Sequence, residues 1–278
     1  MINQDMVRAI VTLAVGENCY RPWYNHLRKG WLQWCSNHGY ELVVFDNFLD
    51  ISLRAKNRSP AWQKLLAMSS PEIASFEQVL WLDADVMVGA HAPDPLLGVP
   101  LSKVGMARDV GSPLAHEPDW FRRTWSTILL RSLGLNHLSV MNEMFSYLDL
   151  WGFDARRRPL WNSGVIAFSP KHHGALFRHI YETWSDGGPG ALHEMVPLNL
   201  ELTQRSLLHE IDPRFNLLFG VHHAVWDVNP LAVQRLHGLG EELVDFESFA
   251  VALAQRSFFL HFAGAHRRME RLLSSGCL

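Results

Sequence analysis

The chain has 278 residues, of which 48% are hydrophobic and 19% charged, so a sizeable core can form and a disordered chain is excluded. Its 25 basic and 28 acidic residues give a net charge of -3, without the basic surplus expected of a nucleic-acid-binding protein. The cysteines are odd in number and widely spaced (Cys19, Cys35 and Cys277), which excludes a disulfide framework and a CxxC metal pair and fits a reducing compartment.

The first predicted element is a buried strand over residues 7–15, rich in Val, Ile and Leu. Its apolar stretch of about seven residues follows no basic segment, which is typical of a strand and not of a signal peptide. No run in the chain approaches the roughly 20 apolar residues that a membrane helix needs. We therefore expect a cytoplasmic protein with no transmembrane segment.

A helix is predicted next, with Asn18 as its N-cap and Gly39 just after its end. A second strand follows over residues 41–46. The helix carries one apolar stripe at helical spacing, formed by Trp23, Leu27, Trp31 and Trp34. A strand, a helix and a strand in this order predict a βαβ unit, which favours a parallel sheet with a right-handed crossover.

The rest of the chain predicts one α/β domain over residues 1–278. A helix begins at Pro60 with Ser59 as its N-cap. Residues 109–160 are helical in pattern and dotted with arginines, so we expect an insertion over the sheet and not a separate domain. Further short apolar runs predict strands over 79–83, 104–107, 165–168 and 258–262.

Two acids interrupt the apolar run VLWLDADVMV, which spans residues 79–88. On a strand, Asp83 and Asp85 would face the same way, about 6.6 Å apart. Two such carboxylates repel each other unless a cation lies beside them, and carboxylate oxygens suit a divalent cation. Ligands of parallel α/β sheets bind at the carboxyl ends of strands. The run therefore predicts a metal site, with a salt-bridged turn or an N-cap as the alternative.

Three motifs in chain order resemble those of glycosyltransferases with the GT-A fold. VLWLDADVMV resembles their DxD strand, WNSGVIAF (161–168) resembles the NSG strand of glycogenin-like enzymes, and HFAGAHR (261–267) resembles their HxxGxxK segment. The resemblance to glycosyltransferase family 8 and to related α-galactosyl- and xylosyltransferases implies a Rossmann-like, mostly parallel sheet. It also implies Mn²⁺- or Mg²⁺-dependent transfer of a sugar from a nucleotide sugar, expected to be a UDP-sugar, with retention of configuration.

The resemblance also assigns residues. The metal ligands would be Asp83, Asp85 and His261. Asp109, Asn162 and Glu194 would act on the donor sugar or the acceptor. Contacts to the nucleotide-sugar donor would come from Thr12, Leu13, Ala14, Lys64, Asp83, Ala84, Gly264 and Arg267. Residues 1–108 would then form the nucleotide-sugar-binding half, and residues 109–278 the acceptor-binding and C-terminal half.

The sequence departs from the family pattern at two positions. Arg267 stands where the family often has Lys, which keeps a positive charge on the diphosphate. Met195 stands where the family has a Gln near the anomeric carbon, which leaves the nucleophile unassigned and keeps open a non-catalytic sugar-binding module. A phosphatase of the haloacid-dehalogenase type is a more distant alternative. The acceptor, whether a glycan, a small molecule, a lipid-linked sugar or a protein, is not encoded in any pattern.

Overall fold

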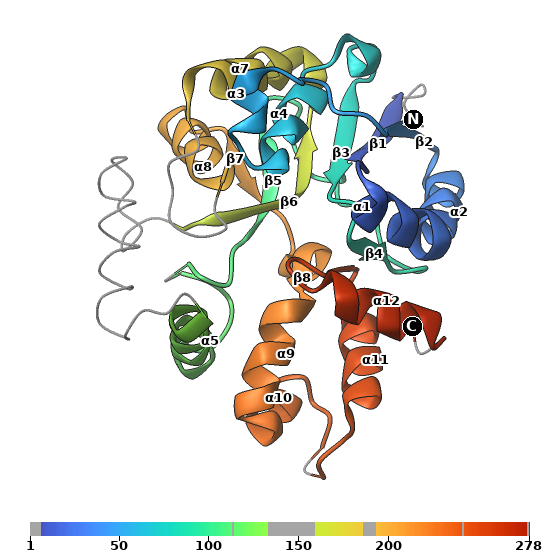
Figure 1. The fold of residues 1–278 in the computed structure, drawn as a ribbon, viewed down its shortest axis with the longest axis vertical. Coiled ribbons are helices and arrows are strands. Elements are labelled where there is room, and N and C mark those ends of the chain that lie inside the picture. Colours follow the sequence, from blue (N-terminus) through green and yellow to red (C-terminus); the bar gives the residue numbers. More distant parts are fainter. Residues whose placement is uncertain (1–6, 113, 133–158, 186–192, 241, 277) are drawn as a thin grey trace.

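Two sheets organise the chain in the computed structural model, which describes residues 7–112, 114–132, 159–185, 193–240, 242–276 and 278 (Figure 1). Within these ranges the central sheet has six strands in the order β2-β1-β3-β6-β5-β7. Their bounds are β1 Arg8–Leu13, β2 Tyr40–Phe45, β3 Gln78–Leu82, β5 Val104–Arg108, β6 Trp161–Phe168 and β7 Leu208–Glu210.

The direction of β6 decides what meets at one edge of the central sheet. The pairings β1–β2, β1–β3 and β5–β7 are parallel, whereas β6 runs antiparallel to both β3 and β5. The sheet is thus mixed, with parallel pairings in the majority. Because Leu82 pairs with Val165, the start of β6 lies beside the end of β3. The ends of β1, β3 and β5 and the beginning of β6 therefore share one edge.

The predicted βαβ unit is confirmed. Between β1 and β2 lie α1 (Glu17–Pro22), a π-helical turn η1 (Trp23–Leu27) and α2 (Arg28–His38). Gly39 ends α2 in the left-handed region, with φ of +72°, as a helix C-terminal glycine does. The expectation for Asn18 was wrong: Gly16 is the N-cap, because its positive φ turns the chain out of β1 and the helix already begins at Glu17.

Hydrophobic clusters cover both faces of the central sheet. Because side chains alternate along a strand, Ile10 and Leu80 face one cluster while Val11 and Trp81 face the other. The second cluster packs against α4 (Gln63–Ala67), α7 (Pro170–Thr183) and α8 (Met195–Gln204). As predicted, Ser59 caps the entry to α4, accepting a hydrogen bond from the Ala61 amide; a short 3-10 turn (Pro60–Trp62) precedes the helix.

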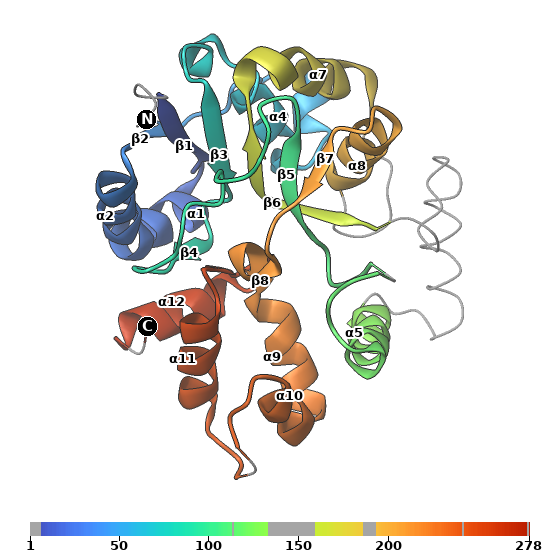
Figure 2. The same cartoon turned by 180° about the vertical axis from the view of Figure 1, so that it is seen from behind.

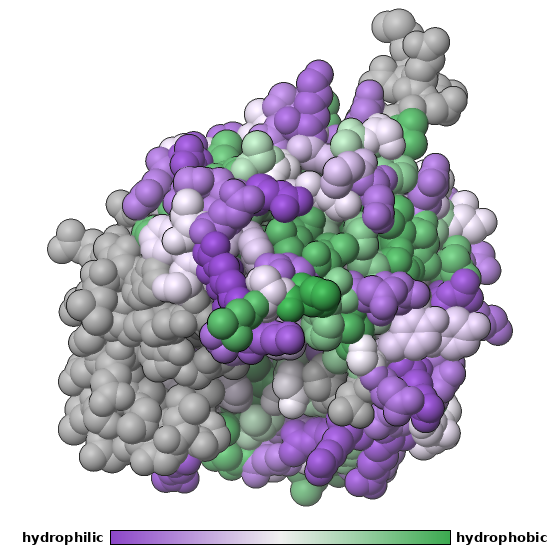
Figure 3. Space-filling view, turned by 45° about the horizontal axis from the view of Figure 1, so that its top comes forward, coloured by the Kyte–Doolittle hydropathy of each residue, from purple (hydrophilic) through white to green (hydrophobic). Residues whose placement is uncertain are grey.

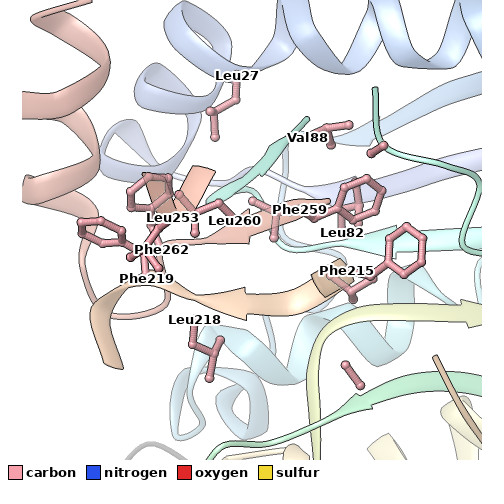
Figure 4. Close-up of a cluster of buried hydrophobic side chains, with 14 of the residues drawn as sticks. Leu27, Leu82, Val88, Phe215, Leu218, Phe219, Leu253, Phe259, Leu260 and Phe262 are labelled. Atoms are coloured by element: carbon pink, nitrogen blue, oxygen red, sulfur yellow. The ribbon is translucent and has the colours of Figure 1, made fainter. Parts of the chain in front are cut away.

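The second sheet has the order β4-β9-β8, with bounds β4 Val86–Val88, β8 Leu217–Leu218 and β9 Phe259–His261. The predicted late strand therefore exists, but it belongs to this small sheet. Its side chains, including Val88, Phe259 and Leu260, pack with Phe215 and Phe262 in a shared core (Figure 4). Antiparallel pairing of Val86 with His261 brings the C-terminal strand next to the end of β3.

The remaining helices form a layer below the central sheet, visible from both sides (Figures 1 and 2). They are α9 (Phe219–Val228), α10 (Pro230–Leu236), α11 (Phe246–Arg256) and α12 (His266–Ser274). Of the predicted helical insertion, α5 (Asp119–Ser132) is confirmed and packs against α9, while residues 133–158 lie outside the described residues. Short helical turns complete the chain at Leu53–Lys56, Pro71–Ile73 and Pro213–Asn216.

The surface carries mixed polarity. On the face shown in Figure 3, hydrophilic side chains surround smaller areas of hydrophobic ones. None of the helices in the described part of the chain combines the length and the apolar character needed to span a bilayer. Cys19 and Cys35 both carry free thiols.

Candidate functional site

Asp83 and Asp85 lie in a turn and not within a strand as expected. Strand β3 stops at Leu82: the Asp83 amide still donates to the Gly164 carbonyl of β6 (2.9 Å), but the Val86 amide donates back to the Asp83 carbonyl (3.0 Å) and closes a turn. The strand alternation that was used to align the two carboxylates therefore does not apply. Their convergence comes instead from a tight turn between β3 and β4.

His261 completes a group of three potential metal ligands with these acids. Its Nε2 lies 3.2 Å from Asp85 Oδ1 and 3.9 Å from Asp83 Oδ2, and one ligand atom from each residue falls within 4.8 Å of the others. Ligands about 2.1 Å from an octahedral ion lie about 3.0 Å apart when adjacent and about 4.2 Å apart when opposite. The three side chains therefore fit a divalent cation, and a mixed oxygen and imidazole set tolerates Mn²⁺.

The imidazole of His261 is buried and tightly held. A Cβ atom on Gly164 would lie 2.1 Å from Cε1 of the ring, so only glycine fits beneath it. On its other side, Nδ1 lies 2.8 Å from Asn216 Oδ1. Burial alone would lower the pKa of His261, but the carboxylates of Asp85 and Asp83 raise it above its ordinary value. The acids thus favour positive charge at this position.

Lys64 connects the acid turn to a third carboxylate. Its Nζ lies 2.9 Å from Asp83 Oδ1 and 3.0 Å from Glu194 Oε1, and it donates to the carbonyl and the hydroxyl of Ser163. The side chain is only 5% exposed, so Lys64 is not a solvated helical lysine. Burial would lower the pKa of Lys64, but the carboxylates of Asp83 and Glu194 raise it well above its usual range.

Glu194 precedes α8 and is buried against the start of β6. Its Oε1 accepts a hydrogen bond from the Ser163 hydroxyl (2.8 Å) in addition to its ion pair with Lys64. Met195, the first residue of α8, is buried as well. Asn199, one turn later, donates to the Trp161 carbonyl and accepts from the Trp161 amide, which fixes the beginning of β6 relative to α8.

Asn162 joins Asp109 to the histidine side of the site. Its Nδ2 donates to Asp109 Oδ2 (2.8 Å), and its Oδ1 accepts from the Gly164 amide (2.9 Å) and from Asn216 Nδ2 (2.8 Å). Burial raises the pKa of Asp109, although its hydrogen bonds from Asn162 and the Gly111 amide oppose this effect. A carboxylate at the end of β5 is thus connected to the imidazole on β9.

The other predicted donor residues lie around this network. Thr12, Leu13 and Ala14 lie at the end of β1, at the same edge of the sheet, and the buried Thr12 hydroxyl has no hydrogen-bond partner among the described residues. Ala84 lies in the acid turn and packs against the core.

Gly264 and Arg267 connect β9 to α12 and begin that helix. Gly264 has a φ of +69°, and a Cβ there would meet nothing within 4 Å, so the conformation and not the space requires glycine. Arg267 is exposed in the first turn of α12.

The sequence interpretation missed three members of the network. Ser163 and Gly164 lie inside the NSG motif, so their positions were marked although their contacts were not. Asn216 ends the Pro213–Asn216 turn, outside the three motifs. Its neighbour Phe215 does pack against Phe258 and Phe259, but the Asn216 side chain bonds both Asn162 and His261.

Comparison with known proteins shows a similarity of fold. No protein-family model matches the sequence, and no curated protein matches it. A glycosyltransferase involved in the glycosylation of the major capsid of PBCV-1 is 13% identical with a TM-score of 0.52, covering 96% of this chain and 99% of its own. The galactosyltransferase LgtC, solved with donor and acceptor sugar analogues, is 14% identical with a TM-score of 0.48, covering 96% and 95%. The first likeness confirms the GT-A fold that the three motifs predicted.

Proposed function

We propose that this chain is a metal-dependent glycosyltransferase that transfers a sugar from a nucleotide-sugar donor, expected to be a UDP-sugar, with retention of configuration. The observation that carries the proposal is the convergence of Asp83, Asp85 and His261 at the ligand edge of a GT-A sheet. Convergence from two sheets and from distant parts of the sequence is not needed for a salt-bridged turn. It is what a divalent cation that holds a diphosphate requires.

The nucleotide-sugar donor would bind at the same edge of the central sheet. Asp85 and His261 would hold the ion together with Asp83, which would share its oxygens with the donor ribose. When bound, Mn²⁺ or Mg²⁺ would offset the negative charge that develops on the leaving diphosphate. The end of β1 would receive the nucleoside, beside the buried Thr12 hydroxyl, which has no hydrogen-bond partner among the described residues. Gly264 and Arg267 would approach the diphosphate from α12.

The residues that would act on the donor sugar or the acceptor are Asp109, Asn162 and Glu194. In the transfer, an acceptor oxygen bonds the anomeric carbon while the bond from that carbon to the diphosphate oxygen breaks. The nucleoside diphosphate leaves with the electron pair, and its leaving oxygen accepts the proton that the acceptor hydroxyl loses. Glu194 is already engaged by Lys64 and Ser163, which suits a role in orienting sugar hydroxyls. Lys64 then acts by holding Asp83 and Glu194, and its expected direct contact with the donor stays a prediction.

Thermal shift with nucleotide sugars in the presence of Mn²⁺ tests the proposal, because ligands that bind the native state raise its stability. A UDP-sugar is expected to raise the midpoint of unfolding only when Mn²⁺ is present, and transfer assays with that donor should release UDP. Absence of any shift with every nucleotide sugar would refute it. A shift without turnover on any acceptor would support a non-catalytic binding module, for which Met195 is the motivating departure.

The remaining predictions concern the acceptor and the place of action. We infer that residues 109–278 bind the acceptor, with the insertion over 109–160 near the opening of the site. The charge balance gives no reason to expect a nucleic acid as the acceptor. The cytoplasmic location stays a prediction from the sequence.

A further inference from the structure

A chain of hydrogen bonds runs from the end of β5 to the metal-facing histidine. It links Asp109, Asn162, Asn216 and His261, and each contact along it is 2.8 Å long. Asn216 is 5% exposed, and it lies at the end of a 3-10 turn that packs through Phe215. Its amide bridges the two halves of the site, one at the central sheet and one at the second sheet.

The Gly164 amide and the Asp109 carboxylate have fixed donor and acceptor roles. They determine which atom donates in each hydrogen bond between Asp109 and His261. The Gly164 amide can only donate, so the Asn162 atom that it contacts is the oxygen. The Asn162 nitrogen consequently faces Asp109, where a carboxylate accepts. Asn162 Oδ1 in turn needs a donor from Asn216, so the Asn216 nitrogen faces Asn162 and its oxygen faces His261.

An oxygen opposite Nδ1 requires that Nδ1 carries a proton. The remaining ring nitrogen, Nε2, faces Asp83 and Asp85, so it is the nitrogen that a divalent cation between these acids would bind. The His261 imidazole lies directly against Gly164, so the ring cannot shift toward the Gly164 backbone. The Gly164 amide and the Asp109 carboxylate fix the orientation of Asn162. Through Asn216 this orientation selects the tautomer of His261, which lies on the second sheet.

We infer that Asn216 is a positioning residue that holds the proton of His261 on Nδ1 and so prepares Nε2 for a divalent cation. The inference rests on the proposed function for its purpose, but the tautomer that it assigns is a property of the protein alone. Partners that orient a ligating histidine typically contribute 10–100-fold to metal affinity. Asn216 also ties the orientation of this ligand to Asp109, the acid assigned to the donor sugar.

Two variants of Asn216 separate its accepting role from its packing. N216A removes the acceptor for Nδ1 and the donor to Asn162, whereas N216D keeps an oxygen opposite Nδ1. Q234L is the matched control, because Gln234 is a fully buried amide in α10 that bonds Glu242 and Val244 away from the site. Circular dichroism and urea unfolding establish which variants fold.

Mn²⁺ affinity is measured by calorimetry without donor, and the proton position by long-range ¹H–¹⁵N NMR of the metal-free protein at a pH where the ring is neutral. The wild type should show Nδ1 protonated in the His261 signal, which is assigned by its loss in H261Q. N216A should bind Mn²⁺ about 10–100-fold more weakly, N216D more tightly than N216A, and Q234L like the wild type. If N216A does not fold, the NMR signal of the wild type still decides.

Two outcomes would overturn the inference: a neutral His261 with its proton on Nε2, or N216A binding Mn²⁺ as tightly as the wild type. A wild-type protein that binds no Mn²⁺ would instead refute the proposed metal-dependent function. The NMR signal of Nδ1 would still report the tautomer in that case, so the two failures are distinguishable.

Discussion

Lys64 and Glu194 form a buried ion pair, with 3.0 Å between Nζ and Oε1 and both side chains at most 5% exposed. Since the same ammonium also pairs with Asp83, K64M would leave two carboxylates without their cation. Removing one partner of a buried pair costs about 3–5 kcal/mol in the free energy of unfolding. Urea denaturation of K64M should show a loss of this size.

The matched comparison for K64M is the double variant K64M/E194Q. It removes the buried negative charge at Glu194, so part of the lost stability should return, while Asp83 stays unpaired. If the double variant is less stable than K64M by the full effect of E194Q alone, the two side chains do not interact, and the pair is not the source of the loss.

Asp85 is predicted to be essential for metal binding and dispensable for folding. D85N removes one negative ligand that faces His261 across 3.2 Å, without changing the size of the side chain. Mn²⁺ binding in calorimetry and sugar transfer should both be abolished, with an unchanged circular dichroism spectrum. E72Q, at an exposed acid on the Pro71–Ile73 turn, is the control and should behave like the wild type. Retained turnover in D85N would dismiss the metal role.

The pair His222 and His237 should make the helical layer sensitive to acid. The two rings share a hydrogen bond of 3.0 Å between His222 Nδ1 and His237 Nε2. Burial, reinforced by Arg256, lowers the pKa of His237 to about 4, and burial, reinforced by His237, lowers the pKa of His222 well below its usual value. Glu117, 3.8 Å from His222, is the nearby acid.

The sign of the pH effect follows from these lowered pKa values. Below about 6.5 the unfolded chain protonates both histidines while the native state does not, so the free energy of unfolding falls as the pH falls. His237 alone should account for about 3 kcal/mol between pH 7 and pH 4. Urea unfolding at several pH values checks this slope.

A variant in which both histidines are replaced tests whether His222 and His237 cause this pH dependence of the free energy of unfolding. H222Q/H237Q should flatten the pH dependence of stability, whereas H179Q, at an exposed position on α7, should leave it unchanged. An equally steep slope in the double variant would assign the acid sensitivity to other groups.

Asn199 is predicted to be a structural residue at the start of β6. Its side chain bonds the Trp161 amide (2.7 Å), the Trp161 carbonyl (2.8 Å) and the Met195 carbonyl (2.7 Å), and it is fully buried. N199L would leave these backbone groups unsatisfied, at about 1–3 kcal/mol each. N229A, which removes only the exposed N-cap of α10, should cost about 1 kcal/mol. Equal losses in urea unfolding would contradict this role.

Much of the fold was predictable because local patterns determine it. Short apolar runs mark β1, β3, β5 and β6, and the tryptophan stripe and Gly39 mark the helical segment that ends with α2. The direction of β6 was not predictable, since nothing in a strand's own sequence states which way its neighbours run. The placement of β9 in a second sheet has the same cause, because its partners β4 and β8 are distant in the chain.

The convergence of Asp83, Asp85 and His261, three potential metal ligands, was predictable from motifs, but the residues that contact them were not. Asp83 and Asp85 were found inside an apolar run, although the turn that contains them, closed by the bond from the Val86 amide to the Asp83 carbonyl, was not predicted. Lys64 carries no local sign of burial, because its partners come from β6 and the start of α8. Asn216 lies 45 residues from His261 and 54 from Asn162, and no periodicity connects such positions.

The contact between Gly164 and the His261 ring can be used to interpret other sequences of this fold. Any side chain at that position would occupy the space of the His261 ring. A protein of the same fold that carries alanine or a larger residue there would have to place its histidine ring elsewhere, even where the paired acids and the histidine survive in its sequence.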